Sequence, residues 1–239
     1  MKDYNRVGEK HTTNEGYPIT IFEYFDAHNC SIVFECGFKL YNRQYNSVKL
    51  GTVKNPYHPS VYGIGYLGQG EYKTKKDNKP TKVYKTWAGM LERCYDVKFK
   101  EKYPTYKGCS VDEKWHNFQV FAKWFEENYT EKSHLDKDIM IKGNKIYSPE
   151  TCCFVPQAIN SIFSIKPKPL NKTPYYHKFQ VQMNKYGKKI YIGLYDTELE
   201  ALLAYKEAKK DYINEVATEY FNNNQLTYGV YMAIINRKI

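Results

Sequence analysis

Apolar and polar residues alternate in the N-terminal part of the chain, which is the pattern of half-buried β-strands. The alternation runs over residues 19–25 and again over 32–36, and residues 26–29 between them have the composition of a turn. We therefore expect a small twisted sheet or barrel of about fifty residues at this end.

Apolar residues further along the chain are spaced as on an amphipathic helix. Tyr84, Trp87, Leu91 and Cys94 share one face of a helix that we expect over residues 82–96. This helix would be the first element of a second structural unit.

A second aromatic stripe predicts another helix in the same unit, with Asp112 as its N-cap. The stripe consists of Trp115, Phe118, Phe121, Ala122 and Phe125. Because aromatic residues at helical spacing usually pack into a core, we expect this stripe to be buried rather than to stack on bases.

Two short strands and a helix follow these two helices. Residues 134–139 form the first strand candidate and carry several polar groups, and residues 152–155 form the second. A loop over residues 142–145 lies between the strands. Residues 157–163 then have helical character.

The C-terminal part begins with the pattern of a β-hairpin. Residues 178–184 and 189–192 alternate, and residues 185–188 form the turn between them. Thr197 and Glu200 then have the spacing of a capping box, which predicts the start of a helix with a small apolar stripe. The residues expected on the outward face of the hairpin are Lys178, Gln180, Gln182, Lys189 and Tyr191.

Prolines at 55–59 and glycines at 63–70 close the first segment, and prolines at 167–169 separate the second segment from the third, which places the boundaries near residues 72 and 166. We expect an α+β protein with three units. These are a small N-terminal β domain at 1–72, a central domain at 73–165, and a C-terminal three-stranded sheet packed on one helix at 166–239.

The charge is strongly basic and unevenly distributed. The formal net charge is +10, and only four residues are arginine. Residues 1–72 carry seven basic and seven acidic side chains, whereas residues 166–195 contain seven lysines and no acid. A one-sign stretch of this length favours an anionic partner. A flexible basic linker, or the lysine-rich codon usage of an A/T-rich genome, is the alternative explanation.

Several classes of protein are disfavoured by the composition. No apolar run reaches the roughly eighteen residues of a membrane helix, and residues 1–6 lack the apolar stretch of a signal peptide. The six cysteines include no C-x-x-C pair, so we expect neither a zinc site nor a disulfide scaffold. Reduced thiols suit the cytoplasm. We expect a cytoplasmic monomer without a membrane partner.

The strand, loop, strand and helix of the central unit resemble the ββα-metal, or HNH, motif of phage homing endonucleases. Residues 135–139 lie where that family has Asp-His-Ile, and residues 151–156 are similar to its Asn-Leu-x-Trp-Val-Thr strand. Asn144 and Asn160 fall where family asparagines occur. The resemblance implies a degenerate HNH-like domain with flanking helices. The ligands that it implies for Mg²⁺ or Mn²⁺ are Asp136, Asp138 and Asn160.

One position departs from the HNH family, since Lys137 occupies the place of the general-base histidine. A histidine can take a proton from water near neutral pH, whereas an ordinary lysine is already protonated. Either Lys137 is neutral in the folded protein, or His134 supplies the base, or the unit no longer cleaves DNA. On a regular strand Asp136 and Asp138 would share one face, and His134 would face away from Lys137 unless the strand bulges.

Residues 192–205 resemble the APETALA-type, or ethylene-response-factor-like, DNA-binding domain. The run Ile-Gly-Leu-Tyr-Asp-Thr-Glu-Leu-Glu-Ala-Leu-Leu-Ala-Tyr matches the family's Leu-Gly-x-Phe-Asp-Thr-x-Glu-x-Ala-x-x-Ala-Tyr. In that family the sheet enters the major groove of double-stranded DNA. Because lysine and glutamine replace most of the family's arginines and tryptophans, we expect DNA affinity with modest specificity. The DNA contacts implied are Lys178, Gln180, Gln182, Lys185, Lys188, Lys189 and Tyr191.

The two resemblances imply a phage-encoded, metal-dependent DNA endonuclease that acts in the host cytoplasm. A non-catalytic DNA-binding protein on a degenerate nuclease scaffold is the first alternative. A host-defence inhibitor that binds an acidic protein, with the basic hairpin as a protein-binding module, is the second. No pattern assigns a role to residues 1–72.

Overall fold

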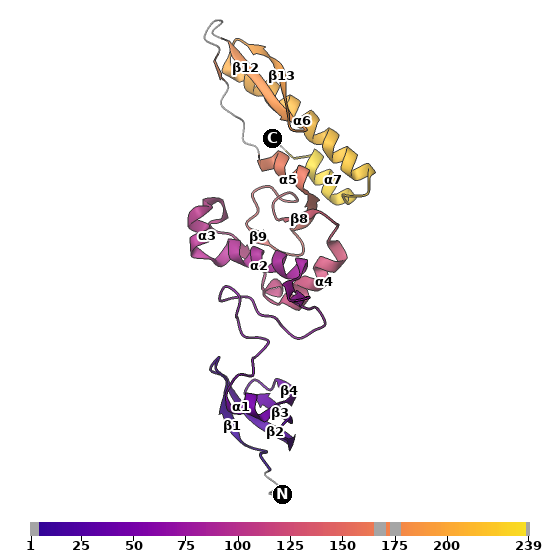
Figure 1. Cartoon of the computed structure of the whole chain (residues 1–239). Helices are drawn as coiled ribbons and strands as arrows, with labels where there is room; N and C mark the ends of the chain where they lie inside the picture. The colour runs from indigo at the N-terminus through magenta and orange to yellow at the C-terminus, as the bar shows by residue number, and fades with distance from the viewer. Residues whose placement is uncertain (1–4, 165–170, 173–177, 238–239) are drawn as a thin grey trace.

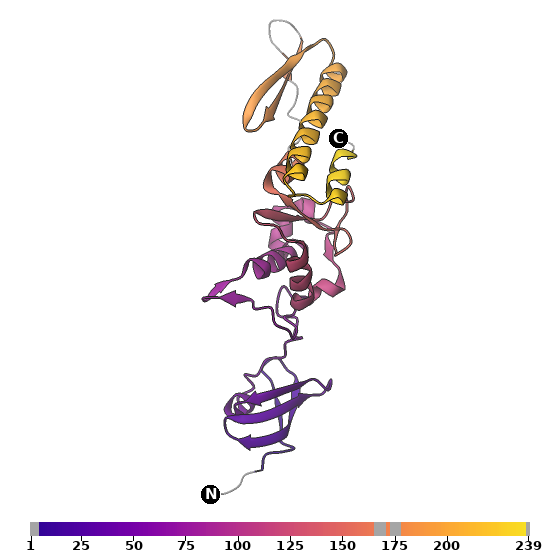
Figure 2. The same ribbon diagram turned by 90° about the vertical axis from the view of Figure 1, so that its right-hand side faces the viewer.

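The computed structural model describes residues 5–164, 171–172 and 178–237. The fold is mixed α+β with several small sheets, as the sequence predicts. The molecule is elongated. A four-stranded sheet lies at the end that holds the N-terminus, and a hairpin with a long helix lies at the opposite end (Figure 1). A view turned by 90° shows the same succession (Figure 2). Within the described residues, no helix is both long enough and apolar enough to cross a membrane.

The N-terminal sheet is antiparallel, with the strands in chain order. The turn predicted at 26–29 joins two of its strands, and Asp26 Oδ1 accepts a hydrogen bond from the His28 amide at 2.7 Å. The alternation before the turn is confirmed at Ile19 and Ile21, which are buried. After the turn Ile32 is also buried, but the strand predicted over 32–36 ends at Phe34, and Cys36 is exposed outside it. The elements are β1 (Lys10–Thr12), β2 (Pro18–Asp26), β3 (Asn29–Phe34), β4 (Lys39–Arg43) and helix α1 (Tyr45–Lys49).

The central helices surround a core of aromatic residues. The first predicted helix is confirmed as α2 (Lys82–Tyr95). Trp87 is fully buried, and its indole Nε1 donates a hydrogen bond to the Trp115 carbonyl at 2.7 Å. The remaining elements before the candidate site are β5 (Lys75–Lys76), β6 (Lys79–Pro80), α3 (Val97–Lys102), η1 (Pro104–Tyr106), β7 (Ser110–Val111), η2 (Glu113–His116) and α4 (Phe118–Asn128).

The N-cap predicted for the second helix is wrong. Asp112 Oδ1 accepts a hydrogen bond from the Lys114 amide at 2.9 Å and so begins the short 3₁₀ helix η2. The α-helix α4 starts only after Asn117, whose Oδ1 accepts a hydrogen bond from the Gln119 amide at 2.9 Å. The stripe itself is buried in the core, as predicted.

The predicted strand, loop, strand and helix are present as β8 (Ser133–Asp136), β10 (Cys153–Pro156) and α5 (Gln157–Ser164), with a short β9 (Ile146–Tyr147) inside the loop. β8 and β10 pair antiparallel, and α5 contacts both strands. β8 is shorter than the predicted 134–139. It ends because Asp136 Oδ1 accepts hydrogen bonds from the amides of Asp138 and Ile139, each at 2.7 Å, which turns the chain.

The C-terminal hairpin packs on a long helix. Its capping box is present: the Glu200 amide donates to Thr197 Oγ1 at 3.2 Å, and the Thr197 amide donates to Glu200 Oε2 at 3.0 Å. The elements are β11 (Asn171–Lys172), β12 (Phe179–Lys185), β13 (Lys188–Tyr195), α6 (Glu198–Asn222) and α7 (Tyr228–Ile235), with the three strands in one antiparallel sheet. Lys166, Lys168 and the proline break at 167–169 lie outside the described residues.

Three hydrophobic cores hold the chain together. The first lies within the N-terminal sheet. The second joins α2 and α4 to Leu135 and Phe154 of the β8–β10 pair, and the third joins Cys153 and Val155 to α5, α6, α7 and the hairpin. Alternate residues of β10 therefore face different cores. The third core draws on residues from both sides of the break expected near residue 166.

Candidate active site and nucleic-acid interface

A cavity of about 670 Å³ lies between α2, β8 and the loop that follows β8. All the catalytic and metal-binding residues predicted from the sequence line this cavity, together with residues of α2 and the end of the chain's described part. Those predicted residues are His134, Asp136, Lys137, Asp138 and Asn160. The structure thus brings together side chains from β8, its following loop and helix α5.

Asp136 is the half-buried carboxylate at the end of β8. Burial is the main cause that raises the pKa of Asp136 above the usual aspartate value, and the neighbouring Asp138 carboxylate adds to it. The two amide hydrogen bonds to Oδ1 act in the opposite direction. Such a carboxylate is held in one orientation but is incompletely solvated, which is typical of functional sites.

The Asp136→Asn substitution should therefore raise the free energy of unfolding at pH 7. A carboxyl whose pKa is raised by folding binds its proton more tightly in the native state, so native stability falls as pH rises through that pKa. The variant's advantage should be full above the raised pKa and absent below the ordinary aspartate range. Urea unfolding of both proteins at several pH values measures this difference. An advantage that grew on acidification would contradict the assignment.

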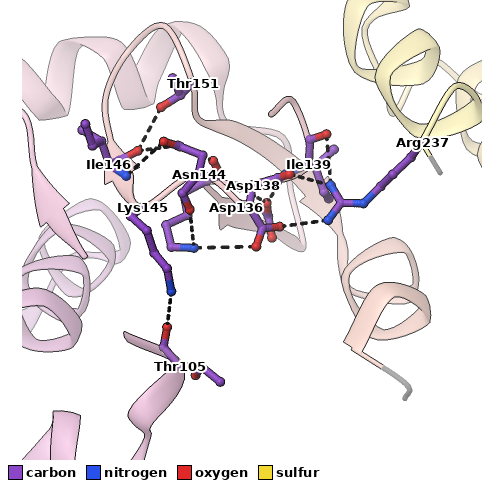
Figure 3. Close-up of polar contacts among 10 residues, drawn as sticks. Thr105, Asp136, Asp138, Ile139, Asn144, Lys145, Ile146, Thr151 and Arg237 are labelled. Carbon is purple, nitrogen blue, oxygen red and sulfur yellow. Dashed lines mark hydrogen bonds and ion pairs between the residues drawn. The ribbon is translucent and has the colours of Figure 1, made fainter. Parts of the chain in front are cut away.

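Asp138 lies between two cations. Lys137 Nζ is 3.7 Å from Asp138 Oδ2, and Arg237 Nη2 is 3.5 Å from Oδ1. Arg237, which follows α7, also donates from Nη1 to the backbone carbonyls of Asp138 and Ile139 (Figure 3). The guanidinium lies 4.9 Å from the centroid of the Phe163 ring. Asp138 thus fastens the loop after β8 to the C-terminal helices.

Lys137 is held in place by contacts within the loop that follows β8. Its Nζ donates a hydrogen bond to the Asn144 carbonyl at 3.0 Å, and its side chain is only 12% exposed. The Asn144 side chain in turn donates to the carbonyls of Lys137 and Ile146, each at 2.7 Å. These contacts close the loop on itself.

His134 reaches the cavity without a bulge. The pairing of β8 with β10 is regular, so His134 and Asp136 lie two residues apart on the same face of β8. The strand ends at Asp136, and the alternation that would have turned His134 away from Lys137 does not continue beyond that residue. The His134 side chain is exposed and lines the cavity.

The oxygen donors of the cavity suit a hard cation. Mg²⁺ prefers oxygen ligands, usually takes one or two carboxylates and keeps several waters. The Asp136 carboxylate and the Asn160 amide line the same cavity and fit this requirement, whereas the Asp138 carboxylate is already paired with two cations. In the described part of the chain, no three His, Cys, Asp or Glu residues form a metal-binding group.

Several cations of the cavity were not predicted from the sequence. Six lysines and arginines line it, against two aspartates, which makes it attractive to anions. Three of the cations are on α2, on the side opposite the predicted apolar stripe, so the polar positions of that helix were the available signal. The unpredicted cations are Lys82, Lys85, Arg93, Lys145 and Arg237.

The C-terminal hairpin presents part of the predicted DNA-binding set to solvent. Gln182 pairs with Tyr191 across the two strands, and Lys189 pairs with Asn184. Tyr191 is 58% exposed. Gln182, Lys188 and Lys189 are also exposed, whereas Gln180 is half-buried opposite the exposed Leu194.

Two of the predicted DNA-binding lysines are engaged within the protein. Lys178 Nζ is 3.0 Å from Asp196 Oδ1, and Lys185 Nζ pairs with Glu215 of α6. These pairs reduce the positive charge at the ends of β12. Gln182, Lys189 and Tyr191 form the centre of the hairpin. Among the residues that the structure describes, no acidic side chain forms an ion pair with this outward-facing centre.

No family model, curated protein or solved structure matches this chain.

Proposed function

We propose that this protein is a DNA-binding, metal-dependent endonuclease that hydrolyses phosphodiester bonds. The observation that carries the proposal is the cavity in which His134, Asp136 and Asn160 lie together with six lysines and arginines. A phosphodiester needs cations to bind it and a base to activate water, and both kinds of group line the same space. The strand, loop, strand and helix order agrees with the HNH resemblance.

The side chains have distinct roles in this proposal. Asp136 and Asn160 would hold a Mg²⁺ or Mn²⁺ ion, which would supply electrostatic stabilisation of the phosphate. His134 accepts the proton of the attacking water. Lys137, Asp138 and Arg237 keep the loop after β8 in place, so Lys137 occupies the family's histidine position without acting as the base.

Cleavage of double-stranded DNA in Mg²⁺, in Mn²⁺ and in EDTA tests this function directly. We expect cleavage that EDTA abolishes and that Asn160→Ala lowers about a hundredfold or more, because a lost metal ligand removes several kcal/mol of transition-state stabilisation. Glu101→Gln, an exposed acid of α3, is the matched control and should cleave normally. Absence of cleavage in both metals at sites the protein binds would refute the endonuclease.

A sequence-preferring DNA-binding protein without nuclease activity is the second candidate. The observation that favours it is Lys137, which stands at the family's base position and is fastened to the Asn144 carbonyl. Both candidates use the exposed centre of the hairpin to bind double-stranded DNA.

Replacing Gln182 or Tyr191 by Ala should weaken binding to a preferred sequence more than binding to random DNA. A glutamine or tyrosine on the outward face can contact base edges, and a good base contact contributes about 1–3 kcal/mol of discrimination. Lys189→Ala should weaken both equally, because lysine contacts phosphate as a point charge. Competition titrations with specific and random duplexes measure both affinities. Equal losses in all three variants would mean that the sheet contacts only the DNA backbone.

A further inference from the structure

One side of helix α2 faces the cavity, and three of the six cations, to which no individual contact has yet been assigned, are among the residues on that side. Their spacing by three, four, seven and eleven residues places them on one helical face. The opposite face, with Trp87 and Leu91, is buried in the second core. The cavity-facing residues of α2 are Lys82, Lys85, Thr86, Gly89 and Arg93.

The Nε of Arg93 is buried and has no hydrogen-bond partner within the described residues. The guanidinium lies 5.5 Å from the centroid of the Tyr147 ring. A buried N–H without an acceptor is destabilising, so such groups usually have a partner. Arginine presents a planar array of donors that matches the oxygens of a phosphate group.

Gly89 lies on the same helical face, one turn after Lys85 and one turn before Arg93. Glycine in a helix interior is less favourable than alanine. A Cβ placed on Gly89 would have no atom within 4 Å, so packing inside the chain does not require glycine at this position. The missing side chain leaves the helix open to the cavity between two cations, as a close approach by a ligand demands.

We propose that Lys85, Gly89 and Arg93 form a binding site for one phosphodiester group of the DNA backbone. The identity of the ligand rests on the proposed function. Arg93 donates hydrogen bonds to the phosphate oxygens, Lys85 adds positive charge, and Gly89 provides the space. Because Asp136 and His134 line the same cavity, a strand bound to α2 lies against the candidate catalytic residues.

DNA binding by the full chain in EDTA, measured by fluorescence anisotropy, tests this site apart from cleavage. Gly89→Leu should raise the thermal midpoint of unfolding, since leucine is a better helix former, and should lower DNA affinity about tenfold or more by filling the space. Arg93→Gln should lower affinity similarly and reduce the salt dependence by about one phosphate contact. Lys98→Ala, on the exposed part of α3 outside the cavity, should change affinity less than about twofold.

The outcomes separate this site from the endonuclease activity. Unchanged affinity and salt dependence in both variants overturn the phosphate site, whether or not the protein cleaves DNA. Loss of affinity in both, without cleavage by the wild type in either metal, supports the site and refutes the endonuclease. If the wild type does not bind DNA, inorganic phosphate at fixed ionic strength should raise its thermal midpoint but not that of Arg93→Gln. An equal response of the two proteins overturns the site.

Discussion

We expect His134→Ala to lower the rate of DNA cleavage by about 10²–10⁴-fold while DNA binding stays unchanged, because a positioned general base contributes that much. His134 lies on the same face of β8 as Asp136, lines the cavity and is exposed. Single-turnover cleavage at saturating protein, compared with binding in EDTA, separates the chemical step from affinity.

Two further variants decide whether the loss belongs to His134 itself. His28→Ala removes a histidine from the β2–β3 turn, outside the cavity, and should cleave normally. Retained cleavage in His134→Ala, combined with its loss in Lys137→Met in a folded protein, would contradict our assignment. It would require Lys137 to leave the Asn144 carbonyl and act on water.

The second large effect concerns stability: Trp87→Ala should reduce the free energy of unfolding by about 3–5 kcal/mol, the usual range for a large aromatic residue lost from a core. Trp87 is fully buried, with its ring centroid 5.4 Å from that of Phe118. Urea unfolding followed by circular dichroism measures the loss.

Trp87→Phe is the matched control for this substitution. It keeps most of the packing but removes the indole donor, so the Trp115 carbonyl loses its 2.7 Å hydrogen bond. The expected loss is smaller, about 1–3 kcal/mol. A loss below about 1 kcal/mol in Trp87→Ala would show that this part of the core repacks easily.

Elements were predicted well wherever burial repeats regularly along the sequence. In the strands around Ile19 and Ile32 and in the helix containing Trp87, the spacing of apolar residues in the sequence matches the side chains that are buried in a core. Boundaries failed where one polar side chain binds nearby backbone amides. Asp136 ends its strand early, and Asn117 rather than Asp112 begins helix α4. Several polar residues near each boundary could have made those bonds, and sequence patterns do not choose between them.

Only part of the candidate site was predicted, because sequence patterns group residues that are close together in the chain. His134, Asp136 and Asn160 lie close together in the sequence, so a local motif could group them. Arg93 and Arg237 line the same cavity but lie far apart in the sequence. The spacing of residues within a short segment therefore could not predict that they meet. The lysine-rich hairpin also carries less free charge than its composition suggests. Lys178 and Lys185 have acidic neighbours on other elements, Asp196 and Glu215.

The contact between Arg237 and Asp138 joins positions that are 99 residues apart in the chain. A ribosome adds about 5–20 residues per second and releases the N-terminal part first. The loop carrying Asp138 therefore leaves the ribosome roughly 5–20 seconds before Arg237 is available to fasten it. During that interval the third core also lacks α6 and α7. A nascent or prematurely terminated chain would thus lack both the contact that holds the loop after β8 and a finished cavity.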